Sequence, residues 1–285
     1  MTQLRIGGVP EHFNLPWHLL LESGACESLG VEARWRDYSE GSGALAAALR
    51  SGELDVAMLL TEGAVAGLAD AGGFKIVSVF TESPLLWGIH VPATSALQTV
   101  ADLKHARYAI SRRGSGSHLM AFVHARERGW PLASLELVVV RNLQGAVEAF
   151  AAGTADVFFW EKFMTQPLVA SGRFRRVGEF AAPWPAFVVC ASTAALERKG
   201  AALAALLPRV LDCAAELKRR RDGAALIAAR YGLDRDDVTE WLRSTRWASR
   251  VGVERAALLP VVEALQQVDL LRPDFEAAEA IAPLR

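Results

Sequence analysis

A nine-residue pattern occurs twice in this chain of 285 residues, first at residues 48–56 and again at residues 149–157. Each copy reads as the end of an apolar-faced helix, a glycine, a polar turn and the start of a buried strand. Glycine just past a helix can adopt the left-handed backbone that closes the last turn, and Gly52 and Gly153 hold that place. Two such units, each preceded by another strand and a turn, predict two similarly built lobes with a cleft between them.

Strands alternate with helices along most of the chain, and the apolar spacing is helical from residue 193 to the end. This alternation implies an α/β fold with largely parallel sheets covered on both faces. We expect residues 1–87 and 186–285 to form lobe 1 and residues 88–185 to form an inserted lobe 2, with crossings near 87–91 and 183–187. The expected strands are 4–9, 31–38, 56–60, 74–81, 85–90, 107–111, 135–141, 157–160 and 187–191.

Composition and charge argue against several classes of protein. Hydrophobic residues make up 52% of the chain, and the net charge is −1. The basic surface of a nucleic-acid-binding protein is therefore missing, and the basic run at 218–221 reads as the solvated face of a helix. No apolar segment is long enough to span a bilayer, and the three cysteines have no paired spacing. We expect no nucleic-acid partner and no membrane insertion.

The N-terminal residues bear on localisation. The segment Met1–Ile6 goes directly into a strand and lacks the charged start, the long apolar run and the cleavage site of a secretory signal. The sequence Ser23–Cys26 weakly resembles a lipoprotein cleavage box, but Glu22 and the missing apolar run argue against that reading. We expect a cytoplasmic protein, or a periplasmic one if a signal peptide has been trimmed.

Several motifs, taken in order, carry a resemblance to a known superfamily. They are Arg5–Pro10, the unit with Gly52 and Asp55, Thr99–Lys104 followed by Gly114–His118, the unit with Gly153 and Asp156 running into Phe159–Glu161, and Ala228–Leu233 with Trp241. By their order and spacing over roughly residues 4–250, the chain resembles the type 2 periplasmic binding proteins. It is most similar to the branch of alkanesulfonate- and taurine-binding proteins and thiamine-pyrimidine precursor binders and synthases. The resemblance implies two α/β lobes joined by two crossing strands, with ligand clamped between them.

Two departures from that superfamily bear on function. The missing secretion signal argues against a transporter receptor, so transporter subunits are expected as partners only if a leader was removed. The chain also lacks the cysteine-rich cluster of the eukaryotic pyrimidine synthases, so their self-consuming chemistry does not transfer. Residues 6–10 followed by 14–16 resemble chorismate dehydratases as well, which are cytosolic enzymes on the same fold.

One group of cleft candidates suits an anion. In open α/β sheets, ligands lie beyond the carboxyl ends of the strands. The loop Gly114–Ser117 lets backbone NH groups converge on a ligand, and a helix N-terminus adds positive potential. Arg112 or Arg113 would supply a bidentate partner for a carboxylate, phosphate or sulfonate; alternatively, Ser117 merely caps a helix after a flexible turn. The candidates from this group are Ser42, Arg113, Gly114, Ser115, Gly116, Ser117, His118 and Asn142.

A second group of candidates is acidic, aromatic and polar. A carboxylate accepts two hydrogen bonds from an amino-substituted nitrogen heterocycle while aromatic rings cover its faces. That chemistry suits an aminopyrimidine-like ligand better than a plain sulfonate. The alternative is that these residues bind no ligand: Trp160 fills the core of its lobe and the glutamates face water. The candidates are Glu11, His12, Phe13, Asn14, Thr61, Glu62, Glu82, Ser83, Trp160 and Glu161.

Recognisable catalytic motifs are missing from the sequence. It contains no GxxxxGK[ST], HExxH, paired CxxC or GxSxG pattern, and His118 and His124 fall on different faces of a helix. We expect no cofactor, no metal and no assigned catalytic residue. The predicted function is the binding of a small anionic or heteroaromatic metabolite, such as a pyrimidine, sulfonate or carboxylate. The alternative is a cytosolic enzyme on the same fold, a thiamine-pyrimidine synthase or chorismate dehydratase-like lyase, with Glu11, His12 and Glu161 as proton-transfer candidates.

Overall fold

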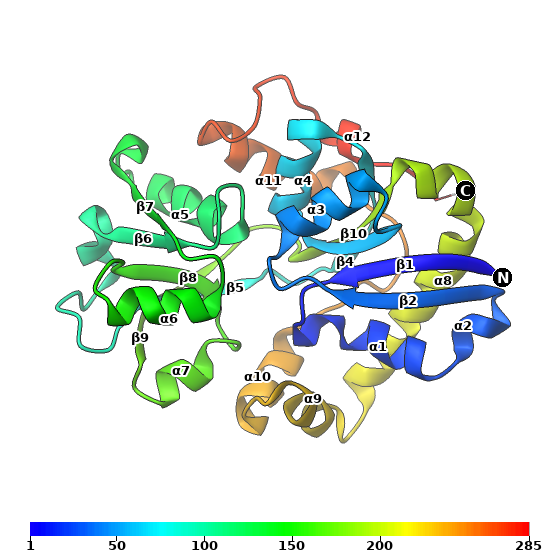
Figure 1. Ribbon diagram of the computed structural model, residues 1–285, viewed down its shortest axis with the longest axis horizontal. Helices are drawn as coiled ribbons and strands as arrows, with labels where there is room; N and C mark the ends of the chain where they lie inside the picture. The colour runs from blue at the N-terminus through cyan, green and yellow to red at the C-terminus, as the bar shows by residue number, and fades with distance from the viewer. Residues whose placement is uncertain (285) are drawn as a thin grey trace.

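A computed structural model describes residues 1–284 and contains two separate five-stranded sheets (Figure 1). The first sheet has the order β2-β1-β3-β10-β4, with β1 Thr2–Gly8, β2 Val31–Asp37, β3 Val56–Leu60, β4 Phe74–Thr81 and β10 Phe187–Ser192. The second has the order β7-β6-β8-β5-β9, with β5 Leu86–Pro92, β6 Arg107–Ile110, β7 Glu136–Val139, β8 Val157–Glu161 and β9 Phe174–Ala181. The predicted two-lobed α/β fold is confirmed.

The two sheets share one topology. In the first, β1 runs parallel to both β2 and β3, and in the second, β6 runs parallel to both β7 and β8. Each sheet is completed by an antiparallel strand from another part of the chain: β10 lies between β3 and β4, and β5 lies between β8 and β9. The repeated sequence unit therefore has the same place in both sheets.

The glycine of each repeat ends a helix as predicted. Helix α3 (Ser42–Ser51) is followed by Gly52 at φ 74°, and α6 (Leu143–Ala151) is followed closely by Gly153 at φ 63°. Both values lie in the left-handed region that glycine adopts without steric cost. The remaining helices before residue 193 are α1 Leu15–Glu22, α2 Ala25–Ser28, α4 Thr61–Ala71, α5 Gly116–Glu127 and α7 Gln166–Ala170, with short 3₁₀ helices at η1 His12–Asn14, η2 Val100–His105 and η3 Leu132–Ser134.

Two short segments connect the sheets. Residues 82–85 join β4 to β5, and residues 182–186 join β9 to β10. The expected first crossing near 87–91 lies inside β5, which pairs only within the second sheet, so the connection comes a few residues earlier. The residue boundaries expected for the lobes stay predictions.

Strand β9 was not predicted from the sequence. It carries Arg175, Arg176 and Glu179 and pairs with β5 alone, at the edge of the second sheet. Edge strands commonly carry charged side chains, which discourage pairing with another molecule. The apolar run that marks a buried strand is therefore missing here.

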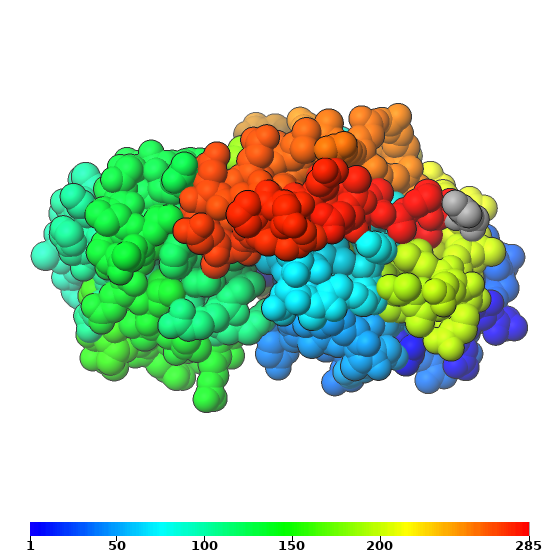
Figure 2. All heavy atoms as spheres, turned by 90° about the horizontal axis from the view of Figure 1, so that it is seen from above, coloured from blue at the N-terminus to red at the C-terminus, as the bar shows by residue number. Residues whose placement is uncertain are grey.

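The C-terminal region is helical, as expected, and touches both lobes. Its helices are α8 Thr193–Arg219, α9 Gly223–Tyr231, α10 Arg235–Ser244, α11 Arg255–Gln267 and α12 Ala277–Ala280. Lys162 Nζ in the second lobe lies 3.1 Å from Glu240 Oε1 on α10, and Arg126 Nε donates to Gln267 Oε1 at 3.1 Å. Figure 2 shows the C-terminal residues lying across the junction of the lobes. Within residues 1–284, no helix combines the length and apolar character needed to cross a membrane.

Candidate functional site

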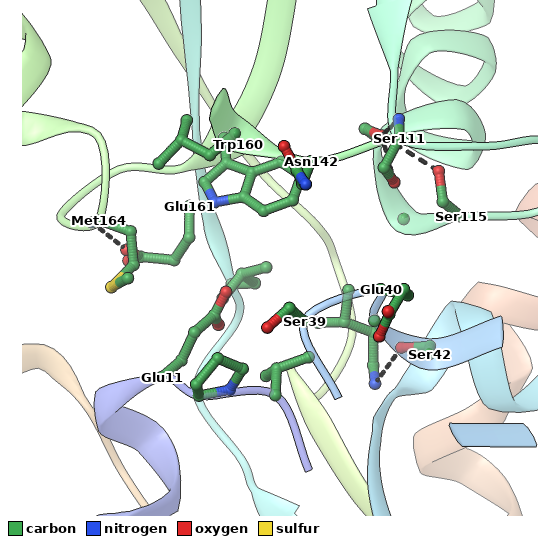
Figure 3. Close-up of a pocket in the computed structure, with 18 of the residues that line it drawn as sticks. Glu11, Ser39, Glu40, Ser42, Ser111, Ser115, Asn142, Trp160, Glu161 and Met164 are labelled. Carbon is green, nitrogen blue, oxygen red and sulfur yellow. Dashed lines mark hydrogen bonds between the residues drawn. The ribbon is translucent and has the colours of Figure 1, made fainter. Parts of the chain in front are cut away.

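A cavity of about 290 Å³ lies where loops of the two lobes face each other (Figure 3). The loops that line it follow the carboxyl ends of β1 and β2 in the first lobe and of β6, β7 and β8 in the second. Ligands occupy this position in open α/β sheets because strand ends and helix N-termini converge there. The location of the cavity agrees with the cleft expected from the sequence.

Three helix N-termini reach the cavity. Helix α3 begins at Ser42, α5 begins just after Ser115, and α6 begins just after Asn142. Ser115 Oγ accepts from His118 N at 3.3 Å and Asn142 Oδ1 from Gly145 N at 2.9 Å, so both side chains cap their helices. Ser42 Oγ accepts from Leu60 N at 3.1 Å, which ties the start of α3 to the end of β3. Together the three termini place positive potential at one region of the cavity.

Arg112 lines the cavity beside two of these termini. A Cβ built on Gly43 would lie 2.5 Å from Arg112 Nη2 and 2.7 Å from its Nε, so the guanidinium packs directly on the first turn of α3. Nη2 is buried and has no hydrogen-bond partner within residues 1–284. Burial lowers the pKa of Arg112, while the charge of Glu40 opposes that shift. An arginine nitrogen that is desolvated and unpaired needs an acceptor.

Apolar and aromatic side chains form the middle of the cavity. They come from both lobes and include Leu60, Leu85, Trp87, Trp160 and Phe187. The ring of Trp160 stacks on Phe158 with 5.0 Å between ring centroids. Gly116 lets Leu60 and Trp87 approach closely, since a Cβ at this glycine would lie 2.7 Å from Leu60 Cδ1. These walls suit a flat or aliphatic ligand body.

Two carboxyl groups lie at the other end of the cavity, away from Ser111 and Ser115 (Figure 3). Glu11 follows β1 in the first lobe, and Glu161 ends β8 in the second. Burial raises the pKa of Glu11 to about 7. Burial also raises the pKa of Glu161 to about 8, to which the charge of Glu11 adds, while hydrogen bonding to Met164 N opposes it.

The structure brings eight predicted residues together at the cavity. They lie at the carboxyl ends of strands, in the loops that follow, or in the first turn of the next helix, where the carboxyl-end rule had placed them. They are Glu11, Ser42, Ser115, Gly116, Ser117, Asn142, Trp160 and Glu161.

Three predicted residues directly after Glu11 face the core instead of the cavity. His12, Phe13 and Asn14 form a 3₁₀ turn and are fully or almost fully buried. The ring of His12 lies 4.1 Å from that of Trp241, and Asn14 Nδ2 donates to Val9 O at 2.8 Å. The turn rotates successive side chains away from one another, so only its first flanking residue, Glu11, reaches the cavity.

The four predicted residues of the first lobe's later loops serve the connections between the sheets. Thr61 Oγ1 donates to Pro185 O, and Glu62 Oε2 accepts from Trp184 Nε1 at 2.9 Å. Ser83 Oγ accepts from Arg246 N at 3.0 Å. Glu82 is exposed and lines a separate hollow with Arg250 and Glu254. None of the four lines the candidate cavity. Helix α4 begins directly at the end of β3 and turns Thr61 and Glu62 toward residues 182–186, while Ser83 contacts the segment of Arg246.

Arg113, Gly114 and His118 also lie outside the cavity lining. Ser115 N donates to Arg112 O at 3.2 Å, which makes residues 112–115 a tight turn with Arg113 and Gly114 exposed at its corner. His118 Nδ1 accepts from Gly114 N at 3.0 Å and so stabilises that turn. The turn directs Arg112 inward and its neighbour Arg113 outward.

Several lining residues were missed in the sequence-based candidate list. Those after β2, β6 and β7 satisfied the same strand-end rule and could have been included. The lining residues from β5, β10 and the connecting segments have no sequence pattern that marks them as ligand-binding, because they reach the cavity only when the two sheets are placed together. Arg112, which the sequence offered as the alternative to Arg113, does line the cavity. The missed residues are Val9, Pro10, Ser39, Glu40, Gly41, Leu60, Leu85, Trp87, Ser111, Leu143, Gln144, Met164 and Phe187. Within residues 1–284, no three His, Cys, Asp or Glu side chains are grouped so that they could hold a metal ion.

Comparisons with known proteins agree with this architecture. A model of the Ca3427-like periplasmic binding protein family matches residues 87–180. The solved structure of the Candida albicans CA3427 gene product, which exhibits the generic periplasmic binding protein fold, aligns with 22% identity and a TM-score of 0.92, covering 100% of this chain and 98% of that one. Comparison with curated protein sequences gives no significant match.

Two ligand-bound structures align over nearly the whole chain. The alkanesulfonate-binding protein SsuA from Xanthomonas axonopodis pv. citri, bound to MOPS, is 22% identical with a TM-score of 0.84, and 99% of each chain is covered. PhnD1 from Prochlorococcus marinus, in complex with methylphosphonate, is 11% identical with a TM-score of 0.65, covering 95% of this chain and 99% of that one. These structures confirm the two-lobed periplasmic-binding-protein fold that the resemblance implied.

Proposed function

Since this chain has the two-lobed fold of the type 2 periplasmic binding proteins, we propose that it binds a small organic anion between its lobes. The observation that carries this proposal is Arg112, whose buried Nη2 has no acceptor within residues 1–284. The guanidinium stands against the first turn of α3, and the backbone of Arg112 is hydrogen-bonded to Ser115 Oγ, the cap of α5. An anionic oxygen placed there would satisfy Arg112 and face two helix N-termini at once.

The ligand class follows from the same geometry. A sulfonate, phosphonate or carboxylate presents the oxygen acceptors that guanidinium and backbone NH groups bind. The aromatic and aliphatic walls from Trp87, Trp160 and Leu60 would contact an organic body attached to the anion. Two structural neighbours hold MOPS, a sulfonate, and methylphosphonate, which supports this class.

Binding would favour the closed arrangement of the lobes. Arg112 belongs to the second lobe but packs on Gly43 of the first. An anion held by Arg112 and the N-terminus of α3 therefore makes contacts that exist only while the lobes are together. Ligand then shifts the population toward closure.

The test is a panel of alkanesulfonates, alkylphosphonates and carboxylates, screened by thermal shift and measured by calorimetry. Arg112→Gln should weaken binding of the best anion by about 10- to 100-fold, the equivalent of about 1.5–3 kcal/mol for a hydrogen bond to a charged group. Arg113→Gln is the matched control, because Arg113 is exposed and outside the cavity. Equal affinities for both variants, or no binding of any anion in the panel, would contradict the proposal.

A proton-transferring enzyme is the second candidate function. One observation favours it: Glu11 and Glu161 lie in one cavity with pKa values of about 7 and about 8, near the range that general acids and bases need. His12, the third proton-transfer candidate from the sequence, packs in the core. An altered ligand found by mass spectrometry after incubation, and lost in Glu11→Gln or Glu161→Gln, would favour the enzyme over the binder.

The proposed binding function has two versions, which differ in the cellular location of the protein and in its partners. Without a leader, the protein would hold its ligand in the cytoplasm; with one, it would deliver ligand to transporter subunits. Fractionation of cells that express the native gene, followed by detection of the protein in periplasm or cytoplasm, distinguishes these versions.

A further inference from the structure

The carboxyls of Glu11 and Glu161 have few partners of their own. Glu161 is 3% exposed, and its Oε2 accepts from Met164 N at 2.7 Å. Within residues 1–284, no other side-chain hydrogen bond reaches Glu161, and none reaches the carboxyl of Glu11. The charged groups that act on Glu161 are Glu11, which disfavours its ionisation, and Arg176, which favours it. The buried carboxyl of Glu161 therefore has a backbone donor but no paired cation, and the half-buried carboxyl of Glu11 has neither within residues 1–284.

The two groups belong to different lobes, as Figure 3 shows with Glu11 below and Glu161 above the cavity. When both are ionised, they repel each other and oppose closure. A positively charged or hydrogen-bond-donating group between them would remove that repulsion and contact both lobes. The anion region beside Ser111 and Ser115 lies at the opposite end of the same cavity.

We propose that Glu11 and Glu161 form a nitrogen-binding subsite, split between the lobes, for a protonated amine, amidine or amino-substituted ring on the ligand whose anionic group lies near Arg112. This inference rests on the proposed anion binding and narrows it: the ligand carries a nitrogen donor at one end and an anion at the other. Trp160 lies between the two ends and contacts the part of the ligand that joins them.

The test compares pairs of sulfonates in which one member carries an ammonium group where the other carries a methyl group. Suitable pairs are 2-aminoethanesulfonate with propanesulfonate, 4-aminobutanesulfonate with pentanesulfonate, and 4-(aminomethyl)benzenesulfonate with 4-ethylbenzenesulfonate. Calorimetry at pH 8 gives the affinity ratio within each pair. We expect the amino member of at least one pair to bind 10-fold or more tightly. In Glu11→Gln and Glu161→Gln that ratio should fall to about 2 or below, whereas Glu263→Gln, an exposed control on α11, should keep it.

The outcomes separate this inference from the proposed function. If the sulfonates bind through Arg112 but no pair reaches a 10-fold ratio, the nitrogen subsite is wrong and anion binding stands. A ratio that survives both glutamine substitutions would also overturn it, because the nitrogen would then be recognised elsewhere. If no member of any pair binds, both the anion site and the subsite that depends on it are rejected.

Discussion

Asp156 accepts a hydrogen bond from the backbone amide of Arg107 at 2.8 Å and two from its guanidinium, at 2.9 Å and 2.7 Å. Asp55 binds Arg5 through the same three donors, at 2.9, 3.1 and 2.8 Å. The aspartate present in both repeats thus joins the residue before β3 or β8 to the parallel neighbour, at Arg5 within β1 or at Arg107 at the start of β6. The repeat is a structural unit of both lobes, and its acid belongs to the sheet rather than to the ligand site.

We predict that both aspartates stabilise the fold, Asp55 more than Asp156. Asp55 is nearly buried and also accepts from Lys199 Nζ at 2.8 Å, whereas the side chain of Asp156 is 29% exposed. Asp55→Asn should lower the free energy of unfolding by about 1–3 kcal/mol, and Asp156→Asn by less because water screens its ion pair. Urea denaturation of each variant measures the difference; a larger loss for Asp156→Asn would contradict it.

Acid should remove the same stabilisation. Burial raises the pKa of Asp55, but the hydrogen bonds from Arg5 and Lys199 outweigh burial, and its pKa is lowered overall. A carboxyl whose pKa is lower in the folded state stabilises the fold above its unfolded pKa, and that contribution is lost as the pH falls through the folded value. The stability difference between the native protein and Asp55→Asn should therefore shrink below about pH 4.

Glu161 should show the opposite pH dependence. Its pKa of about 8 exceeds the ordinary 4.5, so ionising it costs folding free energy, and stability falls as the pH rises between these values. Glu161→Gln removes this cost while keeping the size of the side chain. Its melting temperature should exceed that of the native protein at pH 8.5 and be similar at pH 5. A constant difference across that range would mean that Glu161 does not titrate there.

Substitution of Gly43 should weaken anion binding without loss of stability. Gly43 has no positive φ, so alanine there should stabilise the fold by about 0.4–1 kcal/mol through the lower entropy of the unfolded chain, but its Cβ would meet the guanidinium of Arg112. Gly43→Ala should lower affinity for the best anion about 5-fold or more, while the melting temperature is unchanged or higher. The double variant with Arg112→Gln should bind no worse than Arg112→Gln alone, because both act on the same group. If the losses of binding free energy from the two substitutions add, Gly43→Ala does not act through Arg112.

His12 provides a test of the core placement. Both of its ring nitrogens are buried without a partner within residues 1–284, and burial lowers its pKa to about 3. Replacing an unsatisfied polar ring by an apolar one of similar shape is close to neutral or stabilising. His12→Phe should therefore keep or raise the melting temperature. Trp247→Phe, which removes a 3.1 Å hydrogen bond to Phe13 O, should lower the free energy of unfolding by about 1 kcal/mol. If His12→Phe lowers the free energy of unfolding as much as Trp247→Phe does, His12 is hydrogen-bonded in solution.

The fold was predictable because its signals are local. Apolar periodicity, the glycine after each repeated helix and the order of strands depend on residues close together in the chain, so the sequence alone determined two α/β lobes. The rule that ligands lie beyond strand ends then selected loops that do line the cavity, including those of Glu11, Ser115 and Glu161. The edge strand β9 was not predicted because charged residues interrupt the apolar pattern by which a buried strand is recognised.

Only the tertiary structure decided which side chains within those loops face the cavity. Arg112 and Arg113 are adjacent and chemically identical, yet one hydrogen bond between Ser115 N and Arg112 O turns the first inward and leaves the second in water. Glu11 reaches the cavity while His12, the next residue, packs against Trp241 from the far end of the chain. The packing of Arg112 on Gly43 depends on the docking of two lobes. Side-chain direction in a loop depends on such distant contacts, and the amino-acid order around these residues does not contain them.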